Sequence, residues 1–146
     1  MLTSRGGTAD HGSVLVLMPA AVLIVLLLGA IAVDLTVVHL RQQQAIDAAA
    51  SAANDAVGYG LDQGALRSGR GYRLDPARVR AAVDESIAAQ GLWSSLAAAP
   101  RVTEPVPDEV TVVITLRADY LFARSLPGMP SSTTVQGTAT ATAEQR

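Results

Sequence analysis

Residues 14–33 read VLVLMPAAVLIVLLLGAIAV, and this stretch decides how the rest of the chain is arranged. It contains no charged side chain, and Ser13 and Asp34 mark its two ends. A helix rises about 1.5 Å per residue, so this stretch spans roughly 30 Å, the thickness of a bilayer's hydrocarbon core. Leu, Ile and Val dominate it, and each favours insertion into the membrane. The sequence therefore predicts a single-pass membrane helix from Val14 to Val33.

A cleaved secretory signal peptide is the alternative interpretation of the same stretch. Arg5, the apolar run and Ala30-Ile31-Ala32 are similar to the three parts of such a peptide. The apolar run up to Gly29 is longer than the usual apolar region of a signal peptide, and no turn signal follows the A-x-A site. We therefore favour a retained anchor, and cleavage before Val33 stays open.

Composition limits what the remainder of the chain can do. The chain has 146 residues, which leaves room for one small domain after the membrane stretch. It has no Cys, which excludes disulfides, thiolate catalysis and cysteine metal sites. The net charge of −2 gives no reason to expect a nucleic-acid partner. All basic residues are Arg, and only 3% of residues are aromatic.

The flanking charges predict the orientation in the membrane. The N-terminal side offers the α-amine and Arg5, and the C-terminal side offers Arg41. Basic groups accumulate on the cytoplasmic side of a span, so we expect a short cytoplasmic tail over residues 1–12. The bulk of the chain is then extracytoplasmic, and the protein is placed in the cell membrane.

A long helix is expected to continue beyond the membrane. Residues 35–57 contain neither Pro nor Gly and are rich in Ala and Gln, so one rod from Val14 to about Val57 is predicted, within a first unit of residues 13–57. Small side chains recur along it at helical spacing and would let another backbone approach closely. The hypothesis is that a partner's helix contacts this surface, the alternative being an Ala-rich helix without a partner. The residues assigned to the contact are Asp34, Asp47, Ala48, Ala49, Ala52 and Ala53.

The remaining residues, 58–146, predict a small α+β domain. Asp75-Pro76 marks the start of a helix that should end at Gly91. Apolar and polar residues alternate over 109–120 and again over 132–144, which predicts two antiparallel strands with one apolar face each. The helix beginning at Pro76 is expected to cover that face. Residues 58–75 and 97–108 are rich in Gly or Pro and are expected to be loops.

No chemical site emerges from the sequence. His11 and His39 stand on opposite sides of the predicted span, so they cannot share a metal ion or serve one catalytic centre. Five arginines between Arg67 and Arg80 could bind phosphates, and a solvated surface is the simpler interpretation. We expect no enzyme activity, no cofactor, no metal, no nucleic acid and no small-molecule substrate.

Two blocks of sequence together carry a resemblance to a known family. In the first, Gly12-Ser13 precedes the apolar span, which ends in Ala32-Val33-Asp34-Leu35 and is followed by QAIDAAASAA over residues 44–53. In the second, VTVVITL over 110–116 is followed by Leu121-Phe122-Ala123-Arg124 and the Ala/Thr alternation of 139–143. Their order resembles the TadE/TadG-like proteins of bacterial Flp (tight-adherence) pilus systems.

The resemblance implies a function by assembly and not by catalysis. It implies a minor pilin-like or accessory protein that is held by one span, with its domain outside the membrane. Its partners would be the lipid bilayer and other pilin-like or pilus assembly proteins. Family members that a prepilin peptidase cuts carry Glu at the fifth mature position, where this chain has Leu17, so we expect an uncleaved anchor. An envelope adhesin or sensor that binds through Arg67–Arg80 is the alternative function.

Overall fold

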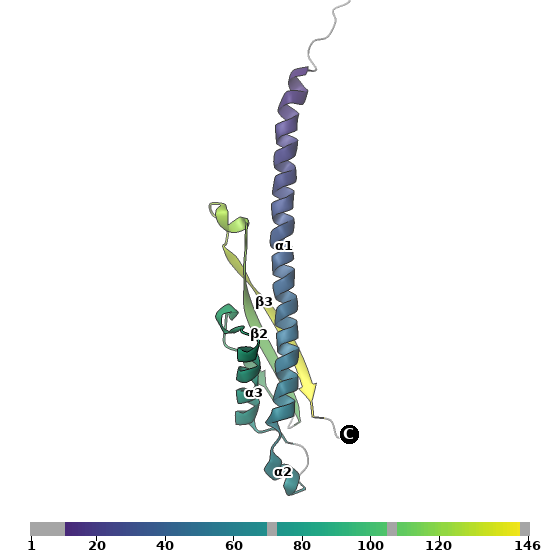
Figure 1. Ribbon diagram of the computed structural model, residues 1–146, viewed down its shortest axis with the longest axis vertical. Coiled ribbons are helices and arrows are strands. Elements are labelled where there is room, and N and C mark those ends of the chain that lie inside the picture. Colours follow the sequence, from purple (N-terminus) through teal and green to yellow (C-terminus); the bar gives the residue numbers. More distant parts are fainter. Residues whose placement is uncertain (1–10, 70–72, 105–107, 144–146) are drawn as a thin grey trace, which may run out of the picture.

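The computed structural model describes residues 11–69, 73–104 and 108–143 (Figure 1). Most of the predicted tail over residues 1–12 lies outside the described residues, as do 70–72 and 105–107 of the two predicted loops. The α+β class is confirmed. The elements in chain order are α1 (His11–Gly60), α2 (Gln63–Arg67), α3 (Pro76–Ala89), the 3-10 turn η1 (Trp93–Ser95), β1 (Arg101–Thr103), β2 (Glu109–Asp119), the 3-10 turn η2 (Ala123–Ser125) and β3 (Ser132–Thr142).

The helix α1 is a single rod of 50 residues that passes through Pro19 and Asp34 without interruption. Most of its N-terminal half projects beyond the sheet, and its C-terminal half lies against the sheet and α3 (Figure 1). The predicted rod is confirmed, with ends at His11 and Gly60. An 18-residue window of α1 has a mean hydropathy of 2.8, so the helix is long and apolar enough to cross a membrane.

Three antiparallel strands form the sheet in the order β1-β2-β3. The long pair runs from Glu109 opposite Thr142 to Asp119 opposite Ser132. Every second residue of β2 from Val110 to Ala118 is fully buried, as the alternation predicts. The sequence missed β1 and α2, because both are short and lie in segments rich in Gly or Pro.

The sheet is covered by α1, which corrects the expectation that the helix beginning at Pro76 covers it. The helix α1 packs against β2, β3 and α3, while α3 packs mainly on α1. The reason is the small size of the facing side chains, which lets the helix backbone lie close to the strands. At the closest point, a Cβ added to Gly137 of β3 would collide with the carbonyl of Ala45.

The start of α3 follows the predicted pattern. The Asp75 carboxylate accepts a hydrogen bond from the Ala77 backbone N–H at 2.9 Å, and Pro76 occupies the first turn, where it costs no backbone hydrogen bond. Val79, Val83 and Ile87 are then buried on one face and complete the core.

Candidate functional site

Asp34 is held by three consecutive backbone N–H groups from a segment almost ninety residues away in sequence. Its Oδ1 accepts from Leu121 at 2.7 Å and from Phe122 at 3.1 Å, and its Oδ2 accepts from Ala123 at 2.8 Å. Only 7% of the residue is exposed. Successive N–H groups that converge on one carboxylate form an anion-binding arrangement, here filled by the chain's own side chain. The segment that leads into η2 is thereby fastened to α1 immediately after the predicted span.

The electrostatics of this contact favour the charged carboxylate. Burial acts to raise the pKa of Asp34, but the backbone hydrogen bonds from Phe122, Ala123 and Leu121 lower it by more. The pKa of Asp34 therefore lies below its usual value of 3.8. The group is ionised at any ordinary pH, and its charge strengthens the three bonds.

The alanines assigned to a partner's helix are occupied within the chain. Ala48, Ala49, Ala52 and Ala53 are between 0 and 1% exposed and belong to the same buried core as the inner face of β2 and the apolar residues of α3. The hypothesis of an intermolecular contact at these four residues is therefore corrected. The close approach that small residues permit is used here for the chain's own sheet and for α3.

The two acidic residues of the same hypothesis have different surroundings. Asp34 makes its polar contact to Leu121–Ala123 of its own chain, in place of a partner helix. Asp47 lies on the exposed side of α1, away from the buried alanines. The structure thus brings Asp34 and the four alanines to the interface between α1 and the domain, and leaves Asp47 at the surface.

The described arginines of the Arg67–Arg80 group do not form a single site. Arg67 lies on α2 and bonds to Gln63, while Arg78 lies on α3 with its Nε 3.8 Å from Asp75. Arg73 is exposed in the segment between the two helices. Arg80 borders a hollow between α3 and the segment that ends in β1.

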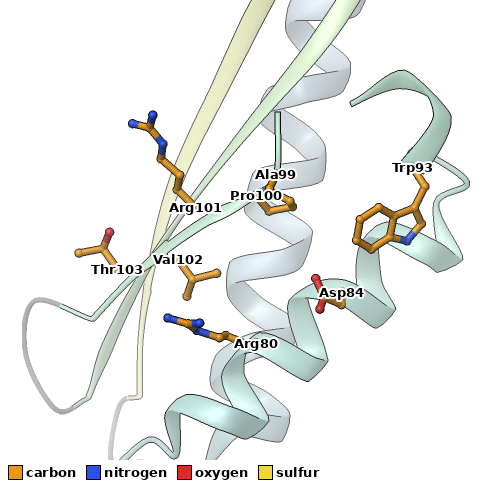
Figure 2. Close-up of a pocket in the computed structure, with 8 residues that line it drawn as sticks. All are labelled: Arg80, Asp84, Trp93, Ala99, Pro100, Arg101, Val102 and Thr103. Atoms are coloured by element: carbon orange, nitrogen blue, oxygen red, sulfur yellow. The ribbon is translucent and has the colours of Figure 1, made fainter. Parts of the chain in front are cut away.

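That hollow has a volume of about 540 Å³ and lies between α3, η1 and the segment that ends in β1. Figure 2 shows Arg80 and Asp84 entering from α3 and Trp93 from η1. The guanidinium groups of Arg80 and Arg101 point to opposite sides of the β1 segment, so they do not converge on one anion (Figure 2). The remaining lining residues are Ala99, Pro100, Val102 and Thr103.

Sequence reasoning singled out Asp34 but missed its partners. The segment at 121–123 presents only backbone N–H groups, and no side-chain pattern announces such donors. The available signal was an acid directly after an apolar span, but at the membrane boundary headgroup water can solvate such a charge, so its position alone indicates no partner.

Comparisons of the chain with protein families, curated proteins and solved structures return no match. Among the described residues, no group of three or more His, Asp or Glu is placed to hold a metal ion. The long apolar N-terminal helix fits a single-pass membrane anchor.

Proposed function

We propose that this chain is a membrane-anchored structural component of a bacterial Flp (tight-adherence) pilus system, acting as a minor pilin-like or accessory protein. The observation that carries the proposal is the continuity of α1. Its exposed apolar half continues as the same unbroken helix into the core of the folded domain. Such a continuous helix would hold the domain at a fixed position over the membrane, where it can pack against other proteins. The TadE/TadG-like sequence blocks supply the pilus system as the setting.

The surfaces available to partners are those that the chain does not bury in its own core. The alanine face is occupied by the sheet and α3, so partners meet the exposed side of α1 or the outer face of the domain. Leu40 and Ile46 are exposed large apolar residues on α1 beyond Asp34, and Asp47 is exposed beside them. Other pilin-like or assembly proteins are the partners proposed for this side of the rod.

Deletion of the gene tests the pilus proposal. We expect loss of surface pili in electron micrographs and restoration by the wild-type chain. A photo-crosslinking residue at Leu40 should then capture another envelope protein, whereas one at Leu66 on α2 serves as the exposed control. Normal pili in the deletion strain would contradict the proposal, and the presence of secretion ATPase and platform genes nearby would support it.

The anchor itself has a separate test. The intact mass of the membrane-extracted protein should correspond to a chain that retains residues 14–33. A mass that corresponds to a chain beginning at Val33 would show signal-peptide cleavage. It would refute the single-pass anchor, whether or not pili are formed.

An envelope binding module is the second candidate function, and the hollow beside Arg80 favours it. Trp93 is 49% exposed there, and Arg80 is the member of the Arg67–Arg80 region that lies beside it. Charge reversal in Arg80→Glu should then weaken retention on an anionic envelope polymer and leave membrane localisation unchanged. Arg41→Glu is the matched control, because Arg41 lies on α1, away from the hollow, and bonds to Gln44.

A further inference from the structure

The connection between β2 and β3, residues 120–131, is defined here as the β2–β3 loop. It lies at the end of the sheet nearest the N-terminal half of α1, whereas α2 lies at the opposite end of the domain (Figure 1). The three hydrogen bonds to Asp34 fix the start of this loop at the first residue beyond the predicted span. The loop is therefore level with the place where the helix leaves the membrane.

Phe122 lies beside a part of α1 that is closer to the N-terminus than Asp34. It borders a hollow of about 580 Å³ whose other lining residues all belong to the predicted span. These residues lie roughly 1.5 to 16 Å on the membrane side of Asp34, at about 1.5 Å of helix rise per residue. The hollow is lined only by apolar residues, namely Leu23, Val25, Leu26, Leu27, Gly29, Ala30, Val33 and Phe122.

The loop presents apolar side chains that the domain does not cover. Leu121, Phe122, Leu126 and Met129 are each between 49 and 55% exposed. Arg124 is the one charged residue in the loop, and it is exposed as well. Exposed apolar side chains gathered in one loop usually mark an interaction surface.

We infer that the β2–β3 loop is a second membrane contact, seated in the outer headgroup and upper acyl region of the bilayer that α1 crosses. The occupant of this surface is lipid, because the surface is continuous with the lipid-exposed span and lies at the same depth. Phe and Leu side chains that enter the boundary between headgroups and acyl chains, and an arginine that extends to the headgroups, are typical of such contacts. The inference depends on the membrane placement of α1 and not on the pilus role.

Single-cysteine labelling tests this inference on the full chain, which contains no native Cys. The variants Leu126→Cys and Met129→Cys carry an environment-sensitive fluorophore in phosphatidylcholine vesicles. A fraction of the lipid bears a spin-label quencher near the top of the acyl chain. Leu27→Cys in the span is the positive control, and Leu66→Cys on α2 is the negative control.

We expect the spin-labelled lipid to quench the two loop labels as strongly as a span label, and to leave the Leu66→Cys label unaffected. Loop labels that stay bright while the Leu27→Cys label is quenched would overturn the loop contact and leave the anchor intact. An unquenched Leu27→Cys label would refute the anchor itself. Loop labels shielded from aqueous iodide but not quenched by lipid would show a protein occupant, which also overturns the inference.

Discussion

Two residues decide how α1 meets the sheet, one through charge and one through the lack of a side chain. Asp34 joins the rod to the β2–β3 loop through three N–H groups. Gly137 lets β3 pass against the helix backbone at Ala45. Neither residue is a catalytic or binding group in the usual sense, because each acts between parts of one chain.

The Asp34 contact predicts a pH dependence. Because its folded pKa is depressed, its stabilising effect is fully present above the usual pKa of 3.8 and is lost as the pH falls through the folded value. Thermal unfolding in detergent micelles should therefore show a stability loss below about pH 3.8 that Asp34→Asn lacks. Asp47→Asn, at an exposed position, is the control and should keep the loss. An unchanged acid profile in Asp34→Asn would contradict the assignment.

Gly137→Ala should separate β3 from α1. The added methyl group meets the carbonyl of Ala45, and overpacking of this kind costs about 1–3 kcal/mol of unfolding free energy. Gly58→Ala is the matched control, because its added Cβ meets nothing within 4 Å. In a helix it should stabilise by about 0.5–1 kcal/mol. Urea unfolding of both variants measures the two effects, and equal midpoints would argue against the close approach.

At the scale of elements, α1 is one continuous helix whose two halves have different surroundings. From Leu17 to Val33 it carries apolar residues all round, almost all of them exposed, and Phe122 of the β2–β3 loop lies beside them. The fully buried side chains on the inner face of its second half are alanines, so the helix lies close to β2 and β3. Because its inner side chains are small, α1 can approach the strands more closely than α3, whose buried side chains are larger. This explains why α1 and not α3 covers the sheet.

The inner face of α1 yields the third prediction. Ala49→Leu or Ala53→Leu should destabilise the domain by about 1–3 kcal/mol, because neither site has room for three more carbon atoms. Ser51→Leu adds a similar volume on the exposed side of the same helix and should change stability by less than about 0.5 kcal/mol. Circular dichroism melts distinguish the two results. Unchanged stability of both alanine variants would contradict the burial of these two residues in the core.

The sequence predicted the individual helices and strands more reliably than the packing contacts between them. Alternation over β2 and the Asp75-Pro76 start of α3 are local patterns, and the structure has both. The packing of α1 on the sheet depends on residues far apart in sequence, and an alanine face is equally suited to a partner's helix or to the chain's own strands. The Asp34 contact was harder still to foresee, because its donors are backbone groups that every non-proline residue possesses.

At the scale of the molecule, the apolar half of α1 and the domain are connected in two ways. The helix α1 has no break between the exposed apolar half and the core, and the Asp34 contact adds a second connection at the junction. Motion of the domain relative to the span would require α1 to bend and these bonds to break. The position of the domain is thus set by the position of the helix.

A proline at the junction should uncouple the two parts in a chain that also carries Asp34→Asn, which removes the second connection. Thr36→Pro removes a backbone hydrogen bond of α1 and clashes with the preceding turn, at a cost of about 3 kcal/mol. Spin labels on Leu27→Cys and Thr138→Cys should give one narrow distance distribution in the parent chain and a broad one in the proline variant. Thr36→Ala, which loses only the side-chain bond to the Ala32 carbonyl, is the control and should stay narrow.

In the proposed membrane anchor, the contact of Phe122 with the apolar half of α1 also limits which bilayers suit the protein. A membrane thinner than the apolar half of α1 cannot be matched by moving the domain along the helix, because the loop is fastened at Asp34. Hydrophobic mismatch is usually relieved by tilt of the helix or by local change in bilayer thickness. In this chain a tilt of the span inclines the whole sheet by the same angle. Lipid thickness would therefore set the direction in which the domain faces its neighbours.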